Sequence, residues 1–315
     1  MARKQQDTRQ QNGKQQNGKQ QNSKQQNSKQ QGSRNGSVRQ DRISEQVDSG
    51  LAEIVRDRDR ADAWTLLLDG APQSHVDLAD PGYLSFEYQR RLGHLVDLAA
   101  APGKPISALH LGGGALTLAR YVATSRPRSR QQVAEIDTRL TELVRRELPV
   151  DKGWQLRVRG GDARDILARS PEAGADLLVA DVYSGARIPA HCTSAEFAAL
   201  AANALRPGGR YAVNITDGGQ LAFARGQVAT LRAVFAEVAM VADPTVLRGR
   251  RFGNLVLVAA QQPLPLDELT RRIATDPFPG RVESGPRLVD FQAGAAPVTD
   301  DGAGPSPAPP PGAFS

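Results

Sequence analysis

Three consecutive glycines interrupt the stretch HLGGGALTLARYV, residues 110–122. Because glycine has no Cβ, the main chain at Gly112, Gly113 and Gly114 can approach a ligand closely and adopt conformations that other residues avoid. No Lys-Ser/Thr pair follows, which argues against a phosphate-binding loop, and GGGALT departs from the G-x-G-x-x-G pattern of dinucleotide-binding proteins. The turn favours a ligand with an adenosine and its ribose diol but no pyrophosphate.

Acidic residues stand at the ends of three further apolar runs. Glu135 in AEID lies about 20 residues beyond the glycines, where a carboxylate can accept hydrogen bonds from both ribose hydroxyls. Asp162 follows in GDAR and Asp181 in ADVYSG. Both aspartates have a structural alternative, which is to cap the helix or loop that follows them. Since open α/β sheets bind ligands at the carboxyl ends of their strands, the acidic residues and the glycines together predict one nucleotide site.

These residues need a sheet whose strands end at a common edge. From residue 107 onward strand-like and helix-like runs alternate, and the strands are nearly continuous apolar stretches, as in a parallel sheet covered on both faces. The expected strands span 107–111, 131–136, 156–160, 176–182, 210–215, 237–242 and 254–260, and the expected helices lie near 115–125, 138–147, 162–170, 193–205 and 220–236. The segment 243–251 is too short for a crossover helix. The sequence therefore predicts an α/β fold with a Rossmann-like, seven-stranded, mostly parallel sheet and an antiparallel last strand.

Four segments are expected along the chain. Residues 1–45 are predicted to be a disordered, basic, Gln/Asn-rich tail, because its QQNGK and QQNSK repeats have no apolar residue to bury. Residues 46–101 are predicted to form a small N-terminal β cap, with strands in WTLLLDG and PGYLSFEY, and a linker helix near 86–100. Residues 102–276 are expected to be the nucleotide-binding, Rossmann-like catalytic domain. Residues 277–315 are expected to be a C-terminal tail, Pro-rich and disordered at its end.

The positive charge of the chain is concentrated in the N-terminal tail. Residues 1–42 hold 10 Lys/Arg and 2 Asp/Glu, a surplus of +8, and the remainder holds 30 and 32, a balance of −2; these sum to the net charge of +6. The tail is therefore either a flexible solubilising arm or an arm that weakly attracts nucleic acid or anionic lipid. The folded part is nearly neutral.

Other features limit the location and the cofactors. No apolar run approaches the ~20 residues of a membrane-spanning helix, and no apolar segment follows the basic N-terminus, so we expect neither a membrane span nor a secretory signal peptide. Cys192 is the single cysteine, which excludes an intrachain disulfide and favours the cytoplasm. The histidines stand at no ligand spacing, so no metal is expected.

Several motifs resemble the spermidine synthase (polyamine aminopropyltransferase) family, a branch of the class I S-adenosylmethionine-dependent methyltransferase fold. They are LLLDGAPQS, GYLSFEYQRRL, HLGGG, AEID, GDAR, LLVADVYSG and LRPGGRYAVNI, which fall in family order between about Trp64 and Gln261. The resemblance implies a co-substrate, either S-adenosylmethionine or its decarboxylated form, and a small-molecule amine acceptor. It also allows a homodimer.

The resemblance also implies roles for individual residues. The three glycines would line the nucleotide, Glu135 would hold its ribose, and Asp162, with Ala163 beside it, would face the adenine amino group. Asp181 would be the catalytic carboxylate that orients the amine and takes up its proton. The remaining substrate-binding residues would be Gln73, Tyr88, Tyr183 and Ser184.

Two positions depart from the family pattern. Ala115 stands where the family usually has an aspartate directly after the glycines, and Ser184 stands where it has a second aspartate three residues after the catalytic one. Both missing carboxylates would recognise cations, and a buried cation without its partner is destabilised. We therefore expect a site that tolerates S-adenosylmethionine with its carboxylate, or an acceptor less cationic than putrescine.

Three functions remain open from the sequence. The first is aminopropyl transfer to an amine in polyamine biosynthesis. The second is methyl transfer on the same fold, which the altered cation-binding positions allow. The third is a non-catalytic nucleotide-binding protein whose basic arm binds a partner.

Overall fold

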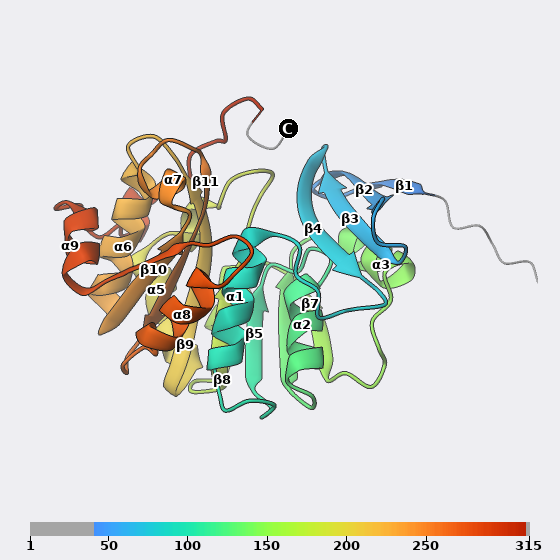
Figure 1. Ribbon diagram of the computed structural model, residues 1–315, viewed down its shortest axis with the longest axis horizontal. Helices are drawn as coiled ribbons and strands as arrows, with labels where there is room; N and C mark the ends of the chain where they lie inside the picture. The colour runs from blue at the N-terminus through green and yellow to red at the C-terminus, as the bar shows by residue number, and fades with distance from the viewer. Residues whose placement is uncertain (1–40, 313–315) are drawn as a thin grey trace, which may run out of the picture. The chain divides into compact units, whose positions relative to one another are not determined.

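The computed structural model describes residues 41–312. The first part of these residues forms a four-stranded antiparallel sheet (Figure 1). Its strands are β1 (Arg42–Val47), β2 (Gly50–Arg56), β3 (Ala63–Leu68) and β4 (Ala71–Asp77), paired in chain order. Asp69 and Gly70 adopt φ angles of +48° and +78° in the turn between β3 and β4, as the Asp-Gly pair predicts. The predicted β cap is confirmed.

Two predictions about this part of the chain are wrong. The tail predicted at residues 1–45 lies mostly outside the described residues, but its predicted end falls inside β1, which pairs with β2 along its whole length. The segment PGYLSFEY is not a strand, because residues 81–86 form a loop and α1 (Glu87–Leu98) includes its last two residues. The helical spacing of buried Leu92, Leu95 and Val96 outweighs the short alternation before them.

The central sheet has eight strands in the order β12-β10-β11-β9-β8-β5-β6-β7. Their bounds are β5 (Ser107–Leu111), β6 (Arg130–Glu135), β7 (Leu156–Gly160), β8 (Ala175–Ala180), β9 (Leu205–Asp217), β10 (Glu237–Ala242), β11 (Gly253–Ala260) and β12 (Arg281–Ser284). The strands from β5 to β9 pair in parallel, and β11 is antiparallel to β9 and β10. The seven predicted strands and the antiparallel last strand are confirmed, and β12 is an eighth strand that the sequence pattern did not reveal.

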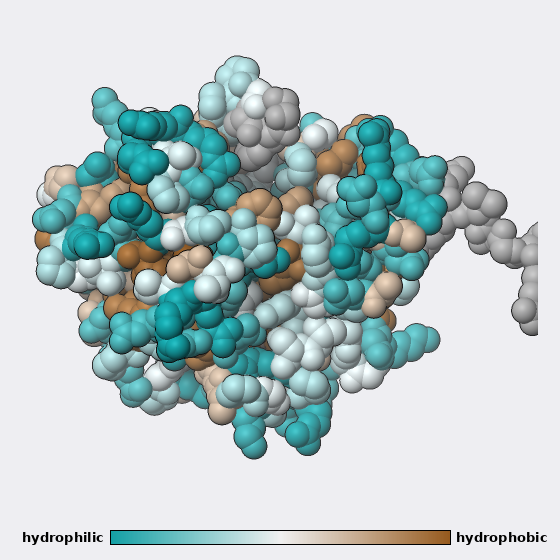
Figure 2. Space-filling view, viewed as in Figure 1, coloured by the Kyte–Doolittle hydropathy of each residue, from teal (hydrophilic) through white to brown (hydrophobic). Residues whose placement is uncertain are grey.

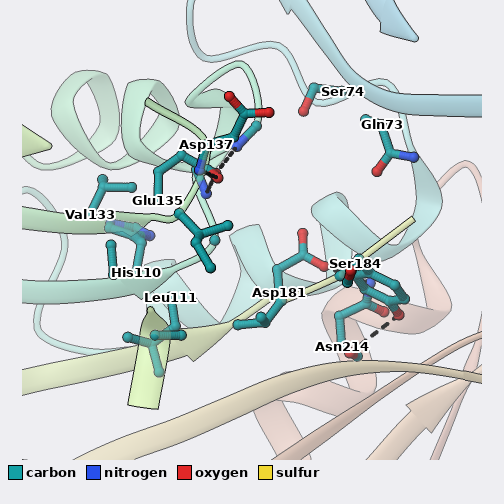
Figure 3. Close-up of a pocket in the computed structure, with 18 of the residues that line it drawn as sticks. Gln73, Ser74, His110, Leu111, Val133, Glu135, Asp137, Asp181, Ser184 and Asn214 are labelled. Atoms are coloured by element: carbon teal, nitrogen blue, oxygen red, sulfur yellow. Dashed lines mark hydrogen bonds between the residues drawn. The ribbon is translucent and has the colours of Figure 1, made fainter. Parts of the chain in front are cut away.

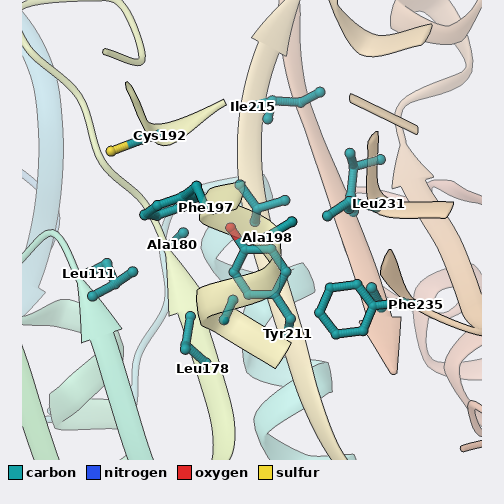
Figure 4. Close-up of a cluster of buried hydrophobic side chains, with 14 of the residues drawn as sticks. Leu111, Leu178, Ala180, Cys192, Phe197, Ala198, Tyr211, Ile215, Leu231 and Phe235 are labelled. Atoms are coloured by element: carbon teal, nitrogen blue, oxygen red, sulfur yellow. The ribbon is translucent and has the colours of Figure 1, made fainter. Parts of the chain in front are cut away.

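Helices cover both faces of this sheet. They are α2 (Thr117–Ser125), α3 (Thr138–Glu147), α4 (Ala163–Ala168), α5 (Ala195–Ala204), α6 (Ala222–Val234), α7 (Pro244–Leu247), α8 (Leu266–Ala274) and α9 (Gly285–Gln292). Successive residues of β8 face opposite sides of the sheet. Leu178 packs with α5 and α6 on one side, whereas Leu177 packs with α1 and α8 on the other. Figure 4 shows the first of these cores, where the rings of Tyr211 and Phe235 stack at 5.9 Å. A strand buried on both faces explains the continuous apolar runs in the sequence.

The C-terminal segment is more ordered than predicted. Instead of a tail, residues 277–312 include β12, which pairs antiparallel with β10, the packed helix α9 and a 3-10 turn at Asp300–Gly302. Even within the Pro-rich stretch, Ser306 is 0% exposed. The Pro-rich composition of its end suggested disorder, but hydrogen bonds to distant parts of the chain, such as those between Ser306 and Ile188, hold it.

No helix among the described residues is long and apolar enough to cross a membrane. In the face shown in Figure 2, hydrophilic side chains cover most of the described surface.

Candidate active site

The glycine turn follows β5 at the carboxyl edge of the sheet, where it is pressed against two other elements. A Cβ on Gly112, whose φ is +90°, would lie 2.1 Å from the carbonyl oxygen of Asp181. A Cβ on Gly114, whose φ is +47°, would lie 2.6 Å from Oγ of Ser74 on β4. At Gly112 the clash is with main chain, so only glycine fits, and at Gly114 a Cβ would have to displace the Ser74 hydroxyl. The turn therefore needs a bare main chain for its own packing as well as for any ligand.

Ala115 does not face the same way as the glycines. Its side chain is 1% exposed and belongs to the apolar cluster between the N-terminal sheet, α2 and α3. Its amide donates to Oγ of Ser74 at 3.2 Å. Of the two departures from the family pattern, only Ser184 lines the cavity described below.

Glu135 ends β6 and holds the glycine turn. Its Oε2 accepts hydrogen bonds from the amides of Gly113 and Gly114 at 2.8 and 3.2 Å, and its Oε1 accepts from the amide of Asp137 at 3.0 Å. A carboxylate that accepts several backbone hydrogen bonds fixes the local main chain firmly. Glu135 therefore positions the turn in addition to lining the cavity (Figure 3).

Asp162 has the structural role that the sequence left open. Its Oδ1 caps α4 by accepting from the amides of Arg164 and Asp165 at 2.8 and 3.2 Å. Its Oδ2 lies 2.9 Å from Nε2 of His191. Partial burial raises the pKa of Asp162, but the hydrogen bonds from Asp165 and His191 together lower it by more than burial raises it. The pKa of Asp162 is therefore below its ordinary value. Asp162 is an ionised cap that also lines the cavity, together with Ala163.

Asp181 follows β8, and polar groups surround its carboxyl group. Nδ2 of Asn214, on β9, donates to its Oδ1 at 2.9 Å. Burial raises the pKa of Asp181, and the hydrogen bonds from Asn214 and Tyr88 lower it in part, leaving a net rise. Burial also raises the pKa of Tyr88 well above its ordinary value, and the charge of Asp181 adds to that rise. Asp181 is thus a carboxylate held by neutral donors, with its proton affinity increased.

One cavity of about 380 Å³ brings the predicted site residues together. Gly112, Gly113, Gly114, Glu135, Asp162, Ala163, Asp181, Gln73, Tyr88, Tyr183 and Ser184 all line it. Figure 3 shows Glu135 and Asp181 at the ends of their strands, with Gln73 and Ser74 reaching the cavity from β4. The lining carries four carboxylates, those of Glu135, Asp137, Asp162 and Asp181, and no Lys or Arg among the described residues. Such a site is suited to a cationic ligand.

The sequence missed several polar residues of the lining. They are Ser49, Ser74, Gln89, His110, Thr117, Asp137, His191, Asn214, Thr216 and Asn254. Most of them lie inside strands or helices, and several stand within the motifs quoted above without a role assigned to them there. Only the pairing of distant strands reveals that they face the cavity. His110 is the clearest structural residue among them: burial lowers its pKa to about 4, although a hydrogen bond to Gln131 opposes this, so the ring is neutral.

Comparisons with known proteins agree on one family. No protein-family model matches the chain. The chain is 26% identical over 196 residues to the polyamine aminopropyltransferase of Vibrio vulnificus (strain CMCP6), which is 60% of this chain and 62% of that protein. The chain thus spans less than two thirds of that curated relative.

Solved structures extend the comparison. A probable spermidine synthase from Corynebacterium glutamicum ATCC 13032 matches with 30% identity and a TM-score of 0.76, over 82% of this chain and 95% of that one. The spermidine synthase from Thermotoga maritima shares the fold, with a TM-score of 0.56 at 16% identity over 79% of this chain and 82% of that one. The glycine turn and the acidic strand ends, together with this match over nearly the whole relative, show that the chain belongs to the spermidine synthase (polyamine aminopropyltransferase) family, a family of transferases.

Proposed function

We propose that the protein transfers an aminopropyl group from a sulfonium nucleoside of the S-adenosylmethionine type to a small amine. The observation that carries this proposal is the gathering of the predicted residues around one cavity whose lining has four carboxylates and no Lys or Arg among the described residues. Both reactants, a sulfonium donor and an amine acceptor, are cationic, and they are favoured by such a lining.

The donor would bind along the glycine turn. All three glycines line the cavity, so main chain without side chains faces it there, which suits the close approach of a nucleoside. Glu135 would hold the ribose, while Asp162 and Ala163 would lie at the adenine. When bound, the donor supplies an electrophilic carbon next to its sulfonium.

Asp181 is placed to serve the acceptor. An amine attacks only when its nitrogen carries a free lone pair, and the nitrogen gains a positive charge as the new C–N bond forms and the C–S bond breaks. The electrons of the C–S bond go to sulfur, and the proton left on nitrogen passes to the Asp181 carboxylate. The raised pKa of Asp181 improves it as a proton acceptor. Gln73, Tyr88 and Tyr183 would orient the amine.

The donor is either decarboxylated S-adenosylmethionine or S-adenosylmethionine itself, and Ser184 bears on this choice. With a serine in place of the second family aspartate, the lining has one negative charge fewer for the acceptor. S-adenosylmethionine with methyl transfer is therefore the second candidate. The two reactions leave different products: aminopropyl transfer leaves methylthioadenosine, and methyl transfer leaves S-adenosylhomocysteine. Chromatography after incubation with each donor and a panel of amines distinguishes them.

Replacing Glu135 with glutamine is expected to weaken nucleoside binding by about 10- to 100-fold, because hydrogen bonds to a charged acceptor are stronger than those to an amide. The new amide group would also direct a donor at one of the three backbone amides. Calorimetry with methylthioadenosine measures the change. Exposed Glu142 on α3 is the matched control, since Glu142→Gln leaves the cavity intact. Equal affinity in Glu135→Gln and the wild type would contradict this role.

Replacing Ser184 with aspartate is expected to lower the KM for putrescine by about 10-fold, since a new charge at the cavity rim gains one favourable ion pair with the acceptor. Ser184 is exposed, so its replacement leaves the fold intact. Ser184→Asn has the same shape without the charge and serves as the control. Steady-state kinetics with putrescine and with a monoamine make the comparison; a similar change for both amines, or for both variants, would exclude charge recognition at this position.

A homodimer, a cytoplasmic location and weak binding of nucleic acid by the tail stay predictions. The tail lies outside the described residues.

A further inference from the structure

One wall of the cavity is a loop whose only regular element is a short 3-10 turn, Ala190–Cys192. Residues 184–193, named here the cavity loop, follow β8 and contribute Ser184, Gly185, Ala186, Pro189 and His191 to the lining. Within the loop, Ser184 and Arg187 form an isolated β-bridge with backbone hydrogen bonds of 2.8 and 3.3 Å. A loop with so few regular hydrogen bonds needs support from elsewhere to keep one conformation.

That support comes from the C-terminal segment. Residues 298–306, named here the strap, lie against the cavity loop, and Ser306 is its anchor. The amide of Ile188 donates to Oγ of Ser306 at 2.8 Å, and the amide of Ser306 donates to the carbonyl of Ile188 at 3.1 Å. Nε of Arg187 donates to the carbonyl of Ser306 at 2.5 Å. Ser306 is fully buried although most of the strap is exposed, so these contacts fix the strap by hydrogen bonding rather than by apolar packing.

A second set of contacts joins the strap to the predicted adenine end of the cavity. Asp300 accepts from both NH groups of Arg164 at 2.7 and 2.6 Å. The same guanidinium donates to the carbonyl of His191 at 2.9 Å, and the His191 ring lies 2.9 Å from Asp162. The hydrogen bonds from Arg164 hold the pKa of Asp300 at about 2, so this carboxylate is ionised at neutral pH. Hydrogen bonds thus link Asp300 to Arg164, Arg164 to the main chain of His191, and the ring of His191 to Asp162.

We infer that the strap positions the cavity loop for nucleoside binding, with Ser306 and Asp300 as positioning residues that do not touch the ligand. Ser306 fixes the middle of the loop, and Asp300 fixes His191 through Arg164. The flanking Pro305 and Pro307 restrict the strap, which lowers the entropy lost when it binds the loop. The effect on nucleoside affinity depends on the proposed function, whereas the contact between strap and loop does not.

Ser306→Ala and Asp300→Asn in the full chain test this inference. Hydrogen exchange of the ligand-free protein is expected to become about 10-fold faster at the amides of the cavity loop. Ser306→Ala acts above all at Ile188, whose amide loses its buried acceptor, and Asp300→Asn acts near His191, because it weakens the bidentate pair that holds Arg164 in place. The Kd for methylthioadenosine is expected to rise about 5-fold, while kcat at saturating substrates stays within about 2-fold of the wild type, since the variants leave the reacting groups in place.

Asp301→Asn is the matched control, because Asp301 is the exposed neighbour of Asp300 and makes none of these contacts with the loop. A general loss of stability would speed exchange throughout the sheet and lower the melting temperature, which separates it from a local effect. Unchanged exchange at residues 184–193 would overturn the role of the strap, and so would faster exchange with unchanged Kd. Absence of nucleoside binding in the wild type would overturn the proposed function instead, and the exchange data would still decide whether the strap holds the loop.

Discussion

Replacing Asp181 with asparagine is expected to lower kcat by about 10²- to 10⁴-fold, the usual contribution of a group that takes up a proton during reaction. The melting temperature is expected to rise at the same time. Burial raises the pKa of this carboxyl group despite the hydrogen bonds from Asn214 and Tyr88, so ionisation is less favourable in the folded protein than in the unfolded chain. Asparagine keeps the shape of the side chain and removes the buried charge.

The stability difference has a definite pH dependence. A carboxyl group whose folded pKa lies above its unfolded pKa destabilises the folded state increasingly as the pH rises through that interval. The gain in melting temperature of Asp181→Asn should therefore be absent well below the ordinary aspartate pKa of 3.8 and should grow as the pH rises above it, up to the raised pKa of the folded protein. Differential scanning fluorimetry across this range measures the gain, and steady-state kinetics measure kcat.

Asp176 provides the control for this experiment. It lies near the start of β8, the strand that Asp181 follows, where it pairs with Arg206 and accepts from the amide of Ser107. Asp176→Asn should leave kcat unchanged. A kcat within tenfold of the wild type for Asp181→Asn would contradict a catalytic role and leave the loop-capping alternative.

Replacing Gly112 with alanine is expected to reduce the free energy of unfolding by about 2–5 kcal/mol, from an unfavourable backbone conformation and a steric clash together. The new Cβ would lie 2.1 Å from the carbonyl oxygen of Asp181 and 2.8 Å from its carbonyl carbon. These atoms belong to the main chain of a buried strand end and cannot rotate away. Because relief of the clash must displace the turn or Asp181, nucleoside binding is expected to fall as well. Urea denaturation and calorimetry provide the two measurements.

Gly103→Ala isolates the conformational part of this effect. Gly103 has a φ of +70°, and a Cβ there would meet nothing within 4 Å. Its replacement should therefore lose only about 1–2 kcal/mol. If the two alanine variants were equally destabilised, the close approach of the glycine turn to Asp181 would not be what requires glycine.

The sequence predicted the part of the fold that depends on local pattern. Apolar runs located the strands from β5 to β11, and the carboxyl ends of parallel strands meet at one edge, so Glu135, Asp162 and Asp181 had to lie close together. The dual role of Asp162 could be stated in advance but not decided, because capping depends on the main-chain geometry of α4.

The remaining features depend on contacts between distant residues. The pairing of β12 with β10 and the burial of Ser306 have no local signal, since both involve polar or Pro-rich segments that are held by partners far away in the sequence. Asn214 lies within the motif LRPGGRYAVNI and His191 lies in none, and neither has a role that the sequence indicates. They reach the cavity only because β9 and the cavity loop are adjacent to β8. The burial of Ala115 in an apolar cluster depends on how the helix leaves the turn, where Leu116 has a φ of +63°.

The most direct test of Asp181-dependent aminopropyl transfer follows the transferred atoms. The wild-type protein and Asp181→Asn would be incubated with decarboxylated S-adenosylmethionine, isotopically labelled in its aminopropyl chain, and with a panel of amines, and the products analysed by mass spectrometry. The predicted result is that the label moves to an amine, with one methylthioadenosine released per transfer, in the wild type and not in the variant. Label that stays in the nucleoside with every amine, or moves equally well in Asp181→Asn, would contradict it.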